Sequence, residues 1–152
     1  MSKYVVLKAP HPVLVRKSEP VVKFDKDLHK MLDDMKETLE YCNGLGLAAP
    51  QVGINKRVAI IDTDDGYFEI INPVLIEHSG FQVGPEGCLS IPNKQGQVKR
   101  YKEIKVKAFD RDGKEKIHHV TNLTARAFQH EMDHLDGILF TDKCDDTYEV
   151  WR

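Results

Sequence analysis

The stretch QHEMDHLDG, residues 129–137, contains the residues of this 152-residue chain that most strongly suggest chemistry. His130 and His134 are four positions apart, so on a helix they lie one turn apart on the same face. Two imidazoles in this arrangement can bind one small cation, and Glu131 beside them can act on a water held by that cation. The alternative is a pair of core histidines that only make hydrogen bonds, because short H-E-x-x-H matches also occur by chance.

The surrounding residues predict the helix that would position the two histidines. Thr121 or Asn122 can cap its first turn, and Gly137 can end it in a left-handed conformation. Helical spacing places Leu123, Ala127 and both histidines on one face. The histidines are therefore expected to point toward the packed side of the helix.

A catalytic metal usually has three protein ligands and one open position, so this helix needs a further ligand from elsewhere. The extended motif H-E-x-x-H-x-x-G-x-x-H would place it at Phe140, whose side chain cannot bind a metal. Among downstream glutamates only Glu149 remains, on a tail too short to build a second ligand helix. The missing ligand is therefore expected upstream.

Among the three cysteines, Cys88 is the favoured ligand. Cys42 fits the apolar side of a predicted helix, and Cys144 lies in a polar tail. Cys88 lies in VGPEGCLSIP, where Gly84 and Gly87 permit a turn with close backbone approach. Alone, Cys88 is more simply explained as an inert buried thiol; together with a histidine pair that lacks a ligand, the metal interpretation is preferred.

The other segments predict an α+β fold in a single domain, residues 1–152. An amphipathic helix is expected over residues 25–44, and RVAIID, residues 57–62, is expected to be a short buried strand. The segments DDG at 64–66 and DRDG at 110–113 are typical of hairpin turns. A helix, several short strands and then the histidine helix make up an α+β order.

Composition excludes several classes of protein. With 41% hydrophobic residues the chain can build one real core, and a net charge of −2 without basic runs argues against nucleic-acid partners. No apolar run is long enough for a membrane span, and the N-terminus does not resemble an export signal. An odd number of cysteines in such a chain favours a reduced, cytoplasmic setting.

The segment GLGLAAPQVG, residues 44–53, lacks the features of a phosphate-binding loop. Its small residues suggest a tightly packed loop after the first helix. Gln51 is its one side chain with both a hydrogen-bond donor and an acceptor. By itself this segment is most simply a connector.

Together, GLGLAAPQ (44–51), EGCLS (86–90) and QHEMDHLDG (129–137) resemble the three motifs of the peptide deformylases, in the same order. The similarity extends over about residues 5–143. It implies short antiparallel β-sheets packed around a central helix that bears the H-E-x-x-H motif.

The resemblance implies a chemical role for each matching position. The metal ligands would be Cys88, His130 and His134. Glu131 would be the general base and acid. The side chain of Gln51 and the backbone N–H of Leu89 would donate hydrogen bonds to the developing oxyanion.

The resemblance also implies how substrate binds. Gly46 and Gly87 would align an extended peptide, and Leu45, Phe128 and His130 would help to wall a pocket for a methionine side chain. The metal would be Fe(II), with Zn(II), Ni(II) or Co(II) able to replace it. The substrates would be N-formylmethionyl nascent polypeptides near the ribosome, in the cytoplasm of a bacterium or of a phage-infected host.

The chain departs from the family pattern in two places. Gln95 occupies a position where many members have arginine, and the tail after Gly137 is short and lacks a helical apolar stripe. The short tail suggests a phage-encoded or otherwise minimal form. Two alternatives are another metal-dependent amidase or protease, and a catalytically idle metal-binding domain, although a structural site would not need Glu131 as a base.

Overall fold

A computed structural model of the chain describes residues 4–144 and 147–149. Its elements, with η denoting a 3₁₀ helix, are η1 (Pro12–Val15), α1 (Lys26–Cys42), β1 (Gly46–Ala48), η2 (Ala49–Val52), β2 (Val58–Thr63), β3 (Gly66–Cys88), β4 (Ile91–Phe109), β5 (Glu115–Thr121), α2 (Asn122–Leu135), η3 (Phe140–Asp142) and β6 (Thr147–Glu149). Within these ranges no helix is both long and apolar enough to cross a membrane. The fold is α+β, as predicted.

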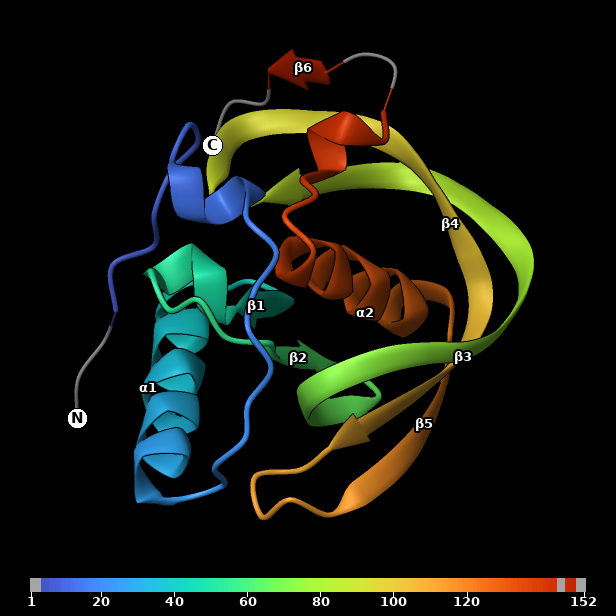
Figure 1. The fold of residues 1–152 in the computed structure, drawn as a ribbon. Coiled ribbons are helices and arrows are strands. Elements are labelled where there is room, and N and C mark those ends of the chain that lie inside the picture. Colours follow the sequence, from blue (N-terminus) through green and yellow to red (C-terminus); the bar gives the residue numbers. More distant parts are fainter. Residues whose placement is uncertain (1–3, 145–146, 150–152) are drawn as a thin grey trace.

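In the described part of the chain, six strands form one antiparallel sheet in the order β1-β2-β3-β4-β5, with β6 paired to β4. The long strands β3 and β4 curve around α2, while α1 lies on the other side of β1 and β2 (Figure 1). Register shifts along the β3–β4 pair mark bulges, which bend a strand and increase its twist. The bent hairpin thereby encloses the histidine helix.

Strand β2 separates two hydrophobic cores. Its alternate residues Val58 and Ile60 pack into the α1 core, whereas Ala59 and Ile61 pack into the α2 core. All four are fully buried. A strand covered on both faces reads as a continuous apolar run, which explains the pattern of RVAIID.

Helix α1 forms for reasons that are local to its sequence. The Asp25 carboxylate accepts a hydrogen bond from the Leu28 N–H at 3.1 Å, as expected of an N-cap residue. The apolar side chains recur at helical spacing and are buried, including Leu32 and Met35 at 0% exposure. The helix ends at Asn43, which takes the left-handed conformation, one residue before the predicted end at Gly44.

Helix α2 is held at its C-terminal end by distant segments. Thr121 is the N-cap residue, but its side chain makes no capping hydrogen bond. At the other end the Leu135 carbonyl accepts bonds from Ser18 N–H at 2.9 Å and Arg57 Nη1 at 2.9 Å. Gly137 is left-handed at φ +75°, as predicted, and a Cβ there would lie 2.6 Å from the Val15 carbonyl carbon.

The strands differ from the prediction in length. Cys88 is the last residue of the 23-residue strand β3, and the expected turn is confined to residues 89 and 90, before β4 begins at Ile91. Gly84 and Gly87 do not have positive φ angles. Gly84 has a packing role, because a Cβ there would lie 3.2 Å from Arg126 Nη2.

Candidate metal centre and cleft

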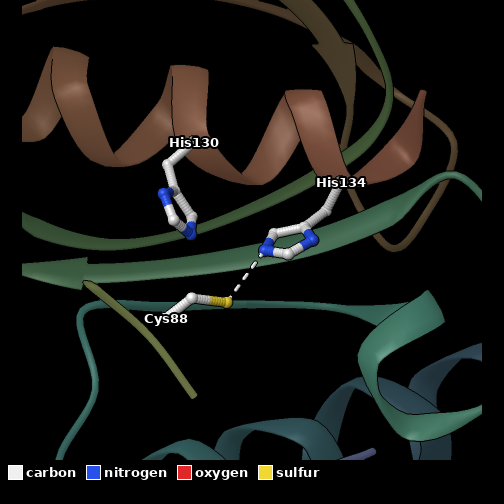
Figure 2. Close-up of side chains that lie close together, drawn as sticks. All are labelled: Cys88, His130 and His134. Atoms are coloured by element: carbon white, nitrogen blue, oxygen red, sulfur yellow. Dashed lines mark hydrogen bonds between the residues drawn. The ribbon is translucent and has the colours of Figure 1, made fainter. Parts of the chain in front are cut away.

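Three side chains from two distant elements meet below α2. His130 and His134 project from α2, and Cys88 lies at the end of β3, facing both rings (Figure 2). Their ligand atoms all lie within 4.8 Å of one another, and the Cys88 Sγ is 3.3 Å from His134 Nε2. The structure thus brings together the three residues predicted as metal ligands.

The donor set fits a divalent metal ion. A tetrahedral ion with metal–sulfur and metal–nitrogen distances of about 2.3 and 2.1 Å would place the sulfur and nitrogen roughly 3.6 Å apart. The Cys88–His134 separation is close to that value. One thiolate and two imidazoles suit iron, zinc, nickel or cobalt better than magnesium or calcium, which prefer oxygen ligands.

Glu86 is a site residue that the sequence reasoning missed. Its Oε1 lies 2.8 Å from His130 Nδ1, so the other ring nitrogen of His130 is directed toward Cys88. A carboxylate behind a ligand imidazole fixes its tautomer and orientation and makes it a stronger donor. Glu86 precedes Cys88 by two residues, and on a strand such residues share a face; that spacing was the available signal.

Glu86 is itself enclosed in a buried charged network. Arg100 Nε and Nη2 donate to its two oxygens at 2.9 and 2.8 Å, and Arg126 Nη1 donates to Oε2. Arg100 also pairs with Asp133 on α2. Burial opposes the charge on Glu86, but the bonds from Arg100 and His130 outweigh it and hold the pKa of this carboxyl well below its usual range. Glu86 is therefore a fixed negative charge behind the metal centre.

Glu131 has the opposite environment. It is buried, and its Oε1 has no hydrogen-bond partner among the described residues. Burial raises the pKa of its carboxyl to about 7, although nearby His130 lowers it. A carboxyl with this pKa can both accept and return a proton near neutral pH.

Gly46 provides the space that Glu131 needs. A Cβ at position 46 would lie 2.6 Å from Glu131 Oε2, which is too close for any side chain. Strand β1, which carries Gly46, therefore packs its backbone directly against the carboxyl group.

Gln51 is oriented by bonds at both ends of its amide. Its Oε1 accepts from the Ala48 N–H at 2.9 Å, and its Nε2 lies 3.2 Å from Ser90 Oγ and 3.5 Å from Cys88 Sγ. The side chain is 1% exposed. The amide N–H group thus points at the metal centre, and the segment that looked like a connector contributes a polar group to it.

These residues line a cleft of about 510 Å³. Of the residues predicted for chemistry or substrate binding, the cleft is lined by Leu45, Gly46, Gln51, Gly87, Cys88, Leu89, His130 and Glu131. Cys42 also lines the cleft, but neither it nor Cys144 belongs to the metal-binding group among the described residues.

Phe128 is placed differently from the prediction. Its side chain is 0% exposed and packs against Phe68 and His118 in the α2 core, with the two phenylalanine rings edge-on at 5.2 Å. Ala127 lines the cleft instead. The reason is helical phase: the cleft side of α2 carries residues 123, 126, 127, 130 and 131, and position 128 is turned about 100° from 127 in the direction away from 126 and 130. The Phe128 side chain therefore faces the core and not the cleft.

Known proteins with similar sequences and folds indicate the family of this chain. A family model described as polypeptide deformylase matches residues 3–149. A peptide deformylase of Heliobacterium modesticaldum is 50% identical over 143 residues, covering 94% of this chain and 95% of the relative. Peptide deformylase 1 of Bacillus subtilis is 50% identical over 145 residues, covering 94% and 91%. The crystal structure of a peptide deformylase from Thermotoga maritima superposes with a TM-score of 0.93 at 39% identity, covering 96% of this chain and 100% of that one.

Proposed function

Because the chain belongs to the polypeptide deformylase family, it is a metal-dependent hydrolase that removes the N-formyl group from the N-terminal methionine of newly made proteins, and we propose that the cleft around Cys88, His130 and His134 is its active site. The products are formate and a free N-terminal amine. The observation that carries the assignment is the meeting of three metal-ligand atoms within 4.8 Å of one another, two of them from residues that line the cleft, Cys88 and His130.

The proposed chemistry assigns one task to each polar group. A bound divalent metal supplies a water whose pKa is lowered toward neutrality. Glu131, which is buried and has a free oxygen, accepts the proton of the attacking water and returns it to the leaving amine. Gln51 Nε2 and the Leu89 N–H donate to the oxyanion, and losing one such donor costs about 3 kcal/mol.

We propose that substrate lies in the cleft as an extended peptide. Gly46 and Gly87 line the cleft and permit close approach of a second backbone. The methionine side chain packs against Leu45 and His130, which also line it, with Ala127 in the place that Phe128 was expected to take. Each buried CH₂ of that side chain contributes about 0.8 kcal/mol.

The ligand assignment is tested by cysteine replacement. We expect Cys88→Ala to lose its metal, measured by metal analysis of anaerobically purified protein, because two imidazoles alone hold a divalent ion weakly. Cys42→Ala and Cys144→Ala are matched controls and should retain one metal per chain. Full metal retention in Cys88→Ala would contradict the assignment.

Substrate choice tests the reaction. We expect formyl-Met-Ala to release its acyl group and acetyl-Met-Ala to react poorly, because an additional methyl must fit beside Gly46, and overpacking costs about 1–3 kcal/mol. Comparing kcat/KM for these peptides and for formyl-Gly-Ala separates the acyl site from the methionine pocket. Equal rates for formyl and acetyl peptides would indicate a general amidase.

We propose Fe(II) as the native metal, one of the ions that the mixed thiolate and imidazole ligands can bind. A redox-active ion beside a thiolate is sensitive to oxygen. Activity of the iron form should therefore decay in air, and exchange for Ni(II) or Co(II) should slow the decay. An iron form that is equally stable with and without oxygen would argue against iron.

We also propose that residues 1–152 act as one catalytic domain, in the cytoplasm and near the ribosome. The proposal is supported by the family match over residues 3–149 and by the substrate, which exists where nascent chains are made. Activity on ribosome-bound formylated chains, compared with free peptides, tests it.

A further inference from the structure

The N-terminal segment around Lys8 connects η2 with the turn at residues 89 and 90, and both of these border the cleft. The Leu7 N–H donates to the Gln51 carbonyl at 2.7 Å, and the Ala9 N–H donates to the Ser90 carbonyl at 2.8 Å. Lys8 lies between these two bonds, so its backbone is held on both sides. It is therefore placed more firmly than an ordinary exposed lysine.

The Lys8 ammonium lies at the rim of the cleft. Its Nζ donates to the Leu89 carbonyl at 3.2 Å, its side chain is exposed, and the residue lines the cleft. One bond uses one of the three N–H groups of an ammonium, so two remain for another acceptor. Since the Leu89 N–H is the proposed oxyanion donor, the ammonium contacts the same residue that would hold the oxyanion.

The charge of the cleft favours an anion at this rim. The carboxylates among its described lining residues are Glu86 and Glu131, and both are buried. Glu86 is already paired with Arg100, and Glu131 lies beside the metal ligands. Lys94 adds a second exposed cation to the lining. Among the described lining residues, the exposed charged groups are therefore the ammonium groups of Lys8 and Lys94, and none is a carboxylate.

We propose that Lys8 is a specificity-determining residue that favours formylated peptides with a carboxylate side chain in the first few positions after methionine. This inference rests on the proposed function of the cleft. An extended peptide advances about 3.3 Å per residue, so the first three positions after methionine extend about 10 Å along the cleft, whose lining includes Lys8. An exposed ion pair of this kind should change kcat/KM by about two- to fivefold.

The test uses short amidated peptides of the form formyl-Met followed by three residues. One position after methionine carries Glu, Gln or Lys in turn, and the other two carry alanine. At low ionic strength we expect one position at which Glu exceeds Gln and Gln exceeds Lys in kcat/KM. The preference should shrink at about 0.5 M salt, where exposed charges are screened. Equal rates for Glu, Gln and Lys at every position would overturn the inference while leaving deformylation intact, whereas failure to deformylate any peptide would overturn the proposed function.

Variants of Lys8 connect the preference to this residue. Lys8→Gln should abolish the Glu preference, Lys8→Arg should retain it, and Lys8→Glu should favour the Lys peptide. Lys23→Gln, which removes an exposed charge elsewhere, is the matched control and should behave like the unaltered protein. A Glu preference that persists in Lys8→Gln and Lys8→Glu would assign it to another residue, with Lys94 the next candidate, and would overturn the role of Lys8.

Discussion

Helices α1 and α2 are stabilised in different ways. Helix α1 buries mainly apolar side chains and carries its own N-cap, so its stability follows from spacing and burial. Helix α2 buries Arg126, His130, Glu131 and His134 beside its apolar residues. Buried charged and polar groups require partners, and Arg126 and His130 find one in Glu86 on β3.

This difference separates a structural helix from a functional one. A change on α1 should alter stability and leave the chemistry intact. A change in the partners of α2 should alter stability and metal binding together, because the same residues support the fold and orient the ligands. The predictions below test that separation.

The largest effect is expected from Glu86→Gln. Removing this charge leaves Arg126 and His130 buried beside a neutral amide, and breaking a buried ion pair typically costs about 3–5 kcal/mol. Metal affinity should also fall by about 10- to 100-fold. Denaturant unfolding and metal titration measure the two effects.

Glu77→Gln is the matched control for Glu86→Gln. Its carboxylate pairs with Lys105 at 3.1 Å on an exposed face, where an ion pair contributes less than about 1 kcal/mol. If both variants lose the same small amount of stability and bind metal normally, the buried network around Glu86 neither stabilises the fold nor supports metal binding as proposed.

On helix α1, Leu32→Ala should cost about 2–5 kcal/mol of unfolding free energy, because it leaves a cavity where a fully buried side chain was removed. In contrast with Glu86→Gln, metal affinity and kcat should be unchanged at temperatures where the variant is folded. A large loss of metal affinity in folded Leu32→Ala protein would show that the two cores are coupled.

Glu131→Gln should affect chemistry with little change in the fold. Removing the proton acceptor should lower kcat by about a hundredfold or more, which corresponds to about 2.7 kcal/mol. The metal should stay bound, because Glu131 is not one of the three ligands. Near-normal turnover would remove Glu131 from the mechanism.

The smallest effect is expected from Asp25→Ala at the start of α1. Loss of its bond to the Leu28 N–H should cost about 1 kcal/mol. Thermal unfolding measures this loss, and kcat should not change. A fall in kcat comparable to that of Glu131→Gln would contradict the separation of the two helices.

The sequence of the C-terminal tail indicated that it is not a helix, but it did not indicate where the tail lies in the fold. The lack of a helical apolar stripe agrees with β6, whose described residues Thr147–Glu149 pair with β4 at Lys94–Gly96. Gln95 is paired with Tyr148 in this register. Strand pairing between residues more than fifty positions apart leaves no local signal, so the position of β6 was not predictable from its own sequence.

The sequence by itself determined the helices, the short buried strand, the two hairpin turns and the identity of the three metal-ligand candidates. Each depends on neighbouring residues: a cap, a helical or strand period, or a motif whose spacing sets a common face. It also determined, through three separated motifs, the family to which the chain belongs.

Only the tertiary structure decided that Phe128 faces the core and Ala127 the cleft, that Glu86 supports His130, and that Lys8 lies at the rim. These facts depend on which face of α2 the long β3–β4 hairpin covers and on where its bulges bend it. Such contacts join residues that are far apart in the chain. Their energies arise from burial and charge pairing across that distance, and no local pattern contains them.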